Sequence, residues 1–182
     1  MQFTKTDIPG IILIQPKILG DDRGYFYESY HAELFSKNGI DKQFVQDNQS
    51  FSHKGVLRGL HFQNPPFAQG KLIRVVQGSV LDIALDIRMG SPTYGKYFSE
   101  IVSSEKQNMI WIPEGFAHGF ITLQDNTIFQ YKCTNYYNKE VEGCILWNDN
   151  DLKIDWNIEN PIISEKDKLG IPFSSYNSKF IF

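Results

Sequence analysis

The sequence predicts an all-β protein, a sandwich or a barrel, built as one domain. Between about residues 44 and 131, most of the chain consists of runs of about four to eight residues rich in apolar and aromatic side chains, which is typical of strands. Short clusters of Gly, Pro, Asn or Ser separate these runs and indicate turns. Many short strands at close spacing favour a sandwich or a barrel. A chain of 182 residues is long enough for one domain with a sizeable hydrophobic core, and too short for two domains that each have one.

The first part of the chain holds two expected strands and the one expected helix. An apolar run predicts a strand at residues 11–14, and residues 21–24 have the composition of a turn. The aromatic run at residues 25–30 predicts a second strand. Residues 31–37 have helical spacing of apolar positions, and the Asn-Gly pair that follows ends the helix.

The other expected strands follow one another without a second helical pattern. They cover residues 44–51, 57–63, 71–77, 80–87, 97–102, 109–112, 116–122 and 127–131. After about Gly143 the chain becomes polar and irregular, with Trp147 and Trp156 as expected anchors. No repeat or linker divides the chain. We therefore expect a single domain over residues 1–182, with a barrel core of about residues 10–145.

Composition excludes several classes of function. Lys and Arg number 18 and Asp and Glu 21, so the net charge is −3 and a basic surface for non-specific nucleic-acid binding is not expected. The N-terminus lacks the pattern of a signal peptide, and no apolar run approaches the roughly 20 residues of a membrane helix. We expect a soluble, cytoplasmic protein without a membrane partner. Cys133 and Cys144 form no paired metal motif and are expected to be buried thiols.

The run KGVLRGLHFQ at residues 54–63 is the stretch most indicative of function. It places Arg58 and His61 among apolar residues that should be buried, and Lys71 follows in the next strand. Buried charge is costly unless it is paired or bound, so an anionic ligand is expected here. Arg suits phosphate, Lys stabilises charge on an oxygen, and His, with an unperturbed pKa of about 6.5, transfers protons near neutrality. Alternatively, Lys71 and Arg74 are ordinary surface cations.

Strand alternation constrains how these side chains could meet. A regular strand puts His61 on one face with Gly59, and Arg58 on the other. If Arg58 and His61 face one pocket, the strand must be irregular between them, and Gly59 is where a bulge costs least. Lys71 shares a face with Ile73 and Val75, so it could project into the same interior as His61.

The histidines do not form a metal motif. Residues 113–118 have the form P-x-G-x-x-H, which in metal-binding cupin barrels delivers a histidine that joins an H-x-H pair. The corresponding pair is His61 and Gln63, and two histidines without a reliable carboxylate would bind a divalent metal poorly. No metal is expected, and a structural role is the alternative for His118. His31 and His53 are expected to be exposed.

Late tyrosines and one aspartate complete the candidates. Tyr131, Tyr136 and Tyr137 lie at and beyond the end of a late strand, where a tyrosine could donate a proton as a general acid or stack on a nucleobase, although aromatic core filling is the alternative for each. Asp167 lies in a polar segment with little reason to fold tightly unless it has a partner. An aspartate that accepts from a histidine ring would fix its tautomer and raise its basicity, but sequence spacing does not pair Asp167 with His61.

Seven blocks, taken together and in order, resemble the dTDP-4-dehydrorhamnose 3,5-epimerase family. The resemblance covers about residues 1–170, without a departure inside the blocks. The blocks are DRGYF at 22–26, QDNQSFS at 46–52 with RGLHFQ at 58–63, QGKLIRV at 69–75, DIR at 86–88, SPTYG at 91–95, IPEGFAHGF at 112–120 and YK at 131–132.

The resemblance implies a cupin-type jelly-roll barrel with a few short helices, and a homodimer that exchanges N-terminal strands. It implies an epimerase without a cofactor that inverts C3 and C5 of dTDP-4-dehydro-6-deoxy-D-glucose through enolates. His61 would be the base, Asp167 its orienting partner, Lys71 the cation on the enolate oxygen and Tyr131 the acid on the opposite face. Further residues would bind the substrate: Gln46, Asn48, Arg58 and His118 at sugar or phosphate, Tyr137 on the thymine, and Arg23, Phe26 and Glu28 from the partner chain.

Other functions stay open at this point. An enzyme of the same fold could epimerise only C3 or only C5, or use another nucleotide sugar. A metal-dependent cupin enzyme is an alternative of a different class, and a non-catalytic sugar-nucleotide binding module is a third.

Overall fold

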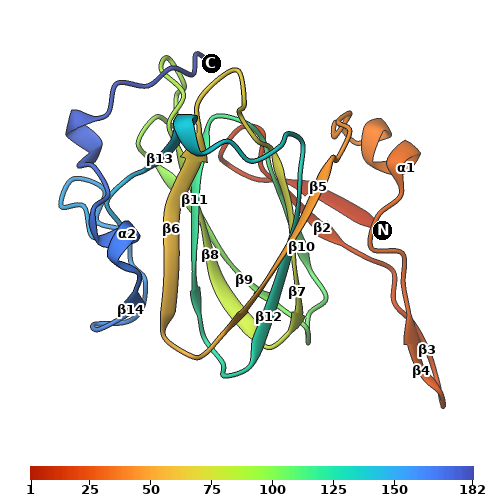
Figure 1. Cartoon of the computed structure of the whole chain (residues 1–182). Coiled ribbons are helices and arrows are strands. Elements are labelled where there is room, and N and C mark those ends of the chain that lie inside the picture. The colour runs from red at the N-terminus through yellow and green to blue at the C-terminus, as the bar shows by residue number, and fades with distance from the viewer.

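Two facing sheets form the body of the molecule in a computed structural model that describes residues 1–182. The first has the order β1-β2-β10-β7-β12-β5 and the second β13-β6-β11-β8-β9, and every pairing within them is antiparallel. This is the jelly-roll barrel that was expected (Figure 1). The strands of the first sheet are β1 (Gln2–Lys5), β2 (Ile12–Gln15), β5 (Gln46–Ser52), β7 (Lys71–Gln77), β10 (Met109–Ile112) and β12 (Thr127–Cys133). Those of the second are β6 (Val56–Gln63), β8 (Ser79–Asp86), β9 (Tyr97–Ser103), β11 (Phe116–Thr122) and β13 (Glu142–Cys144).

Smaller elements surround the two sheets. Strands β3 (Leu19–Asp21) and β4 (Gly24–Phe26) form a separate hairpin, and β14 (Ile162–Ile163) pairs in parallel with β6. The helices are all short: α1 (Ala32–Lys37), α2 (Glu165–Lys168), and the 3₁₀ turns η1 (Lys139–Val141) and η2 (Phe173–Ser175). No helix is long and apolar enough to cross a membrane.

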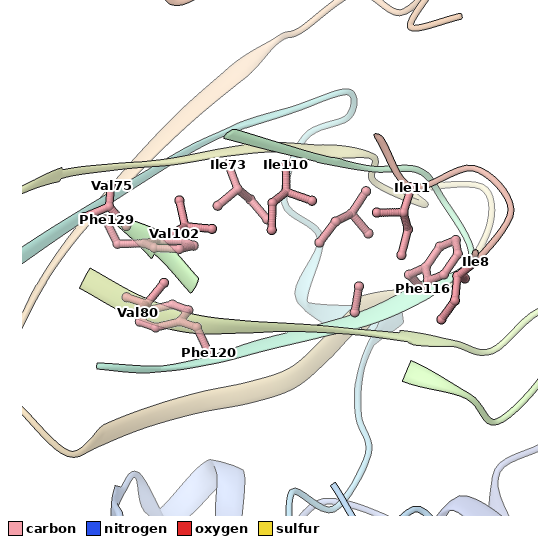
Figure 2. Packing of buried hydrophobic residues seen from close by; sticks show 12 residues of the cluster. Ile8, Ile11, Ile73, Val75, Val80, Val102, Ile110, Phe116, Phe120 and Phe129 are labelled. Carbon is pink, nitrogen blue, oxygen red and sulfur yellow. The ribbon is translucent and has the colours of Figure 1, made fainter. Parts of the chain in front are cut away.

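The main core lies between the two sheets (Figure 2). Strand alternation explains it, because every second residue of a strand points inward. In β7, for example, Ile73 and Val75 are buried on the inner face, the face that Lys71 was expected to share. The cluster comprises Ile8, Ile11, Ile73, Val75, Val80, Ala84, Val102, Ile110, Ile112, Phe116, Phe120 and Phe129.

Both sheets are also covered on their outer faces, which explains their continuous apolar runs. Phe35 of α1 and Ile40 pack on the outer face of the first sheet, against residues such as Trp111. The C-terminal segment covers the outer face of the second sheet through residues including Leu152 and Trp156. Residues after Gly143 are therefore a packed layer, and Trp156 is an anchor as expected.

Several sequence predictions of local structure need correction. The strand expected at residues 25–30 ends at Phe26, and Leu19–Asp21 is a strand that was not expected. Strand β1 was missed because QFTK shows no apolar run, although it pairs with β2 along the sheet edge. The segment expected to be irregular contains β13, β14 and α2, all of four residues or fewer. The other strands and the helix lie where the sequence predicted them, within about two residues at each end.

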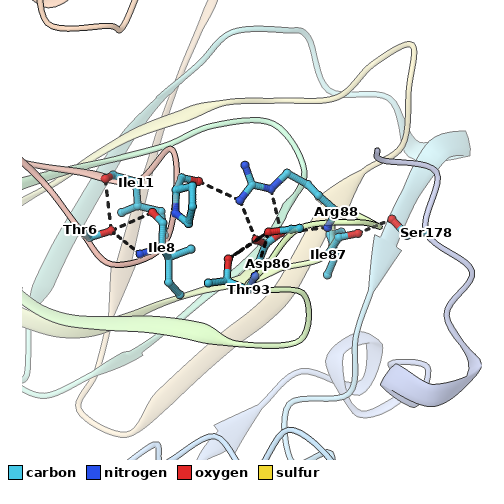
Figure 3. Close-up of polar contacts among 10 residues, drawn as sticks. Thr6, Ile8, Ile11, Asp86, Ile87, Arg88, Thr93 and Ser178 are labelled. Atoms are coloured by element: carbon cyan, nitrogen blue, oxygen red, sulfur yellow. Dashed lines mark hydrogen bonds and ion pairs between the residues drawn. The ribbon is translucent and has the colours of Figure 1, made fainter. Parts of the chain in front are cut away.

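A buried ion pair joins the N-terminal loop to the end of β8 (Figure 3). Asp86 is fully buried and accepts from the Arg88 guanidinium, with Nη2 to Oδ2 at 2.7 Å. Hydroxyls of Ser91 and Thr93 donate to the same carboxylate at 2.6 and 2.7 Å. Arg88 also donates to the carbonyl of Pro9 at 2.9 Å, so one charge pair ties distant segments together.

Candidate active site

A polar cavity of about 300 Å³ opens between the sheets, next to the main core. Its walls come from both sheets. The first sheet contributes residues of β5, β7 and β12, and the second contributes residues of β6 and β11. The lining residues are Asn48, Gln49, Ser50, Arg58, His61, Lys71, His118, Phe120 and Tyr131. Six of the twelve residues predicted for the site therefore line one cavity.

His61 and Asp167 form a hydrogen-bonded pair, although 106 positions separate them in the chain. The ring Nε2 lies 2.6 Å from Oδ1 of Asp167. Asp167 belongs to α2, where the Ser164 side chain caps the helix by accepting from the Asp167 N–H. Nδ1 of His61 has no hydrogen-bond partner within the chain. The carboxylate thus orients the ring, and Nδ1 is free to accept a proton.

The local environment keeps Asp167 ionised. Its side chain is 4% exposed. Burial raises the pKa of this carboxyl. Hydrogen bonds from His61, from the Gly59 N–H and from Ser164 lower it, and the net effect is a pKa below the ordinary value. An ionised Asp167 accepts the Nε2–H of a neutral His61, which is the tautomer that leaves the lone pair on Nδ1.

Gly59 is the position that allows Arg58 and His61 to share the cavity. The pairing of β6 with β11 shifts register between His118 and Phe120, opposite this part of β6. Gly59 has φ of +134°, a conformation that side chains disfavour. A Cβ here would lie 2.5 Å from the Gly119 Cα. The irregularity that the sequence placed at Gly59 is therefore confirmed.

Lys71 and Tyr131 face the second sheet from the first. Burial lowers the pKa of the Lys71 amine, against the attraction of Cys133, Asp82 and Glu142. Its Nζ lies 5.7 Å from the centroid of the Tyr131 ring. Burial also raises the pKa of Tyr131 to about 12, so the phenol holds its proton at neutral pH. The pair therefore offers a poorly solvated cation beside a protonated acid.

His118 has a carboxylate partner of its own. Its Nε2 lies 2.9 Å from Oδ2 of Asp82, and both side chains are buried. Burial is the main cause that lowers the pKa of His118; Lys71 and His61 also lower it, and Asp82 raises it only in part. His118 is thus neutral at pH 7 and donates to Asp82, while the other oxygen, Oδ1, has no partner. His118 thus has a structural hydrogen bond, to Asp82, and also lines the cavity.

The rim of the site contains residues that the sequence predicted and two that it missed. Gln46 accepts from the Tyr137 N–H at 3.0 Å and donates to Asn48 at 3.0 Å. Glu142 accepts from the Tyr137 hydroxyl at 2.8 Å and from Lys166 at 2.6 Å. Burial raises the pKa of Glu142, but its bonds with Lys166 and Tyr137 lower it overall. The only signal for Lys166 was its position beside Asp167, and Glu142 had none.

Arg23, Phe26 and Glu28 do not reach this cavity. Arg23 and Phe26 lie on the hairpin β3–β4, which projects away from the body of the molecule (Figure 1). Arg23 pairs with Asp21 on the same hairpin, and Phe26 is 66% exposed. Within one chain, nothing places these residues at the site.

The residues that were compared with a cupin metal motif, His61, Gln63 and His118, make other contacts in the fold. His61 and His118 each bond a different carboxylate. Gln63 donates to the carbonyls of Phe67 and Tyr136, so its amide holds two loops. The histidines His31 and His53 are exposed, as expected, and His31 caps α1.

Three comparisons identify similar proteins. The family model described as dTDP-4-dehydrorhamnose 3,5-epimerase matches residues 5–175. The dTDP-4-dehydrorhamnose 3,5-epimerase of Shigella flexneri is 49% identical over 174 residues, 95% of this chain and 96% of that protein. The crystal structure of this enzyme from Elizabethkingia anophelis NUHP1 has a TM-score of 0.93 at 44% identity, covering 98% of this chain and 99% of that one. A dTDP-6-deoxy-D-glucose-3,5-epimerase from Legionella pneumophila Philadelphia 1, in complex with dTDP-4-keto-L-rhamnose, has a TM-score of 0.93 at 46% identity, covering 97% and 94%.

Proposed function

The chain belongs to the dTDP-4-dehydrorhamnose 3,5-epimerase family, and we propose that the His61 cavity performs this epimerisation on dTDP-4-dehydro-6-deoxy-D-glucose. The product is dTDP-4-dehydro-L-rhamnose. One observation carries the proposal: His61, which is hydrogen-bonded to Asp167, lines one cavity together with Lys71 and Tyr131. The dTDP-4-keto-L-rhamnose bound to the Legionella relative supports this class of ligand.

The first step is removal of a proton by His61. C3 and C5 both flank the C4 ketone, so loss of either proton leaves an enolate whose charge lies on the C4 oxygen. Nδ1 is the nitrogen that accepts, because Nε2 is engaged with Asp167. The ionised carboxylate then stabilises the imidazolium that forms. Lys71 lies opposite and stabilises the enolate oxygen.

The second step is return of a proton from the other face. His61 projects from β6 of the second sheet and Tyr131 from β12 of the first, so the two groups flank a sugar held between the sheets. A phenol with a pKa of about 12 keeps its proton until the enolate takes it. Protonation on the face opposite deprotonation inverts the carbon. Both steps move only protons, so the proposed mechanism uses no cofactor.

The substrate-binding residues divide between cavity and rim. We assign Arg58, Asn48 and His118 to the sugar and the phosphates, because they line the cavity. Gln46 and Tyr137 are hydrogen-bonded at the rim, where the 54% exposed Tyr137 ring is free to stack on thymine. Lys166 lies at the same rim, where its ammonium pairs with Glu142 at 2.6 Å.

We propose that the enzyme acts as a homodimer that exchanges its N-terminal hairpin. A two-stranded ribbon is marginal in water by itself, and this one exposes Leu19, Tyr25 and Phe26. Seating it on a second copy would cover these side chains and bring Arg23, Phe26 and Glu28 to the partner's site. Residues 1–182 would then act as one epimerase domain, because the C-terminal layer supplies Asp167. Location in the cytoplasm stays a prediction.

Proton NMR in deuterated buffer tests the function. The wild-type protein should incorporate deuterium at C3 and C5 of the substrate without added metal, and a folded His61→Asn variant should not. General base catalysis typically contributes about 10²–10⁴-fold. Exchange at only one carbon would indicate a mono-epimerase. Exchange at neither carbon would indicate that the protein acts on another nucleotide sugar or is a binding module. Activity that a chelator abolishes would favour a metal-dependent enzyme.

A further inference from the structure

We propose that Cys144, His61 and Asp167 form a binding site for a thiophilic divalent cation such as Zn²⁺, and that its occupation stops the enzyme. One ligand atom from each residue lies within 4.8 Å of the other two. These are a thiol sulfur, an imidazole nitrogen and a carboxylate oxygen. They are the three donor types that Zn²⁺ takes from proteins.

Three separate elements bring the ligands together. Cys144 lies in β13 directly opposite His61 of β6 in the antiparallel ladder. Alternation puts Cys144 on the same face as Glu142, while Gly143 faces the other way, against the Phe62 ring. Asp167 arrives from α2, held there by the Ser164 cap. The sulfur thus points to the side of β6 on which the His61–Asp167 pair lies.

The geometry suits a small metal ion after a modest adjustment. Zn–N and Zn–S bonds of about 2.0–2.3 Å separate tetrahedral ligand atoms by about 3.5 Å. Nε2 of His61 and Oδ1 of Asp167 start at 2.6 Å and would separate, while Cys144 would close in from within 4.8 Å. Three protein ligands leave a fourth position for water, the pattern of an open zinc site.

The local charge also accommodates a dication. A Cys144 thiolate and the Asp167 carboxylate together balance two positive charges. The nearby ammonium of Lys166 is neutralised by Glu142 at 2.6 Å. Burial raises the pKa of Cys144 to about 12, so the thiol is protonated in the metal-free protein and the metal must displace that proton.

Metal binding would disable the proposed base in a defined way. When Nε2 binds the cation, the ring proton that it shared with Asp167 moves to Nδ1, and the thiol proton passes to solvent. Nδ1 then carries a hydrogen and has no lone pair to accept a proton from the substrate. The binding stands independently of the proposed function, whereas the inhibition rests on His61 as the base.

The site differs from the metal set of a cupin enzyme. It uses one histidine and needs neither His118 nor Gln63, whose polar atoms are engaged elsewhere. The cation here would oppose catalysis, so the metal-free mechanism and this site are compatible.

Two readouts on chelator-treated protein test the proposal. Titration with Co²⁺ should give a near-ultraviolet thiolate charge-transfer band, absent in Cys144→Ser and retained in the matched control Cys133→Ser. Zn²⁺ should inhibit substrate proton exchange by the wild type, while Mg²⁺, a hard cation, should not. Cys144→Ser should stay active and need more than about tenfold more Zn²⁺ for the same inhibition, since loss of even an outer partner costs about 10–100-fold.

The outcomes separate the site from the proposed function. No thiolate band in the wild type, or a band that survives Cys144→Ser, would overturn the site. If the wild type shows the cobalt thiolate band and is active, but Zn²⁺ does not inhibit its substrate proton exchange, the proposal that the metal stops the enzyme is wrong. Wild-type protein that exchanges no substrate proton in the absence of metal would refute the proposed function, and the cobalt spectrum would still decide the site.

Discussion

At the scale of single residues, the active site depends on charges that the fold makes costly. Burial lowers the pKa of Lys71 and of His118 and raises that of Tyr131. Each of these shifts follows from the loss of water, which disfavours the charged form. In the free enzyme the Lys71 ammonium is thus poorly solvated, and an enolate oxygen would supply the negative charge that it lacks.

Replacing Lys71 by Met should separate activity from stability. Loss of the cation should lower kcat about 10²–10³-fold, in line with roughly 2.7–4 kcal/mol for removing one oxyanion donor. The free energy of unfolding at pH 7 should not fall, because the folded state depresses the Lys71 pKa and so penalises the charged form. That penalty is present below the folded pKa and is relieved as pH rises through it toward the unfolded value.

Urea unfolding at pH 7 and steady-state kinetics measure both quantities. Lys5→Met, at an exposed position on β1, is the control and should change neither. A Lys71→Met protein with wild-type kcat would remove this residue from the mechanism.

At the scale of elements, β6 is the strand on which the candidate site is built, and its irregularity at Gly59 lets the side chains of Arg58 and His61 share a cavity. The backbone there runs against the neighbouring β11, since the Gly59 position lies beside the Gly119 Cα and the His118 carbonyl. The side chains of the candidate site on β6 therefore depend on a backbone contact that only glycine permits.

Gly59→Ala should destabilise the protein and displace His61. Its cost combines an unfavourable positive φ with overpacking against backbone, each worth roughly 1–3 kcal/mol. Gly39→Ala is a matched control, since its φ is +89° and no atom lies within 4 Å of an added Cβ. Urea titrations should show a clearly larger loss for Gly59→Ala. Equal losses would mean that the approach of β11 contributes nothing.

The end of β8 supports a prediction about pH. Burial raises the pKa of Asp86, but hydrogen bonds from Arg88, Ser91 and Thr93 lower it below its ordinary value (Figure 3). A depressed folded pKa stabilises the protein above the unfolded pKa of about 3.9, and the contribution is lost as pH falls through the folded pKa. Asp86→Asn should therefore cost about 3–5 kcal/mol at pH 7, because it leaves the largely covered Arg88 side chain, 12% exposed, without its anionic partner.

Stability curves of the wild type and Asp86→Asn against pH check this prediction. The gap between them should be constant from neutrality down to about pH 4 and should narrow below it. A gap that does not change down to acid unfolding would show that the charge of Asp86 is not what stabilises this region.

At the scale of the whole molecule, the C-terminal layer and the N-terminal hairpin have opposite roles. The layer packs Trp156 and Leu152 on the second sheet and carries Asp167 to His61. The root of the hairpin is held to the body, where Tyr27 donates to the buried Gln107 at 2.6 Å. The rest of the hairpin extends outward, and Phe26 on its strand β4 is 66% exposed, as expected of an arm that reaches another copy.

Mixed dimers should test the exchange. His61→Asn supplies an intact hairpin, and an Arg23→Ala, Phe26→Ala double variant supplies an intact catalytic cavity. Random pairing of equal amounts should restore about a quarter of the wild-type sites, because each heterodimer regains one complete site. Activity equal to the mean of the two separate variants would contradict the exchange, and unequal mixing ratios provide the control.

What the sequence by itself determined was the local order and the family. Strand periodicity placed nearly all barrel strands, and seven spaced blocks identified the family that the comparisons confirm. The apolar run around Arg58 and His61 marked the site, since charges in a buried strand need a partner. Strands β1 and β13 were missed because each is too short to show a period and, unlike the equally short β2 and β10, neither contains an apolar run.

Only the tertiary structure decided which residues meet. Asp167 bonds His61 across 106 positions, and Asp82 bonds His118 across 36. No spacing rule pairs residues so far apart, because their contact depends on how the sheets close and where the C-terminal layer packs. The same closure brings Glu142 to the rim of the site without a sequence signal, and places Cys144 beside His61 and Asp167. The sequence thus indicated candidate functional side chains on individual strands. Long-range packing determined which carboxylates bond the two histidines.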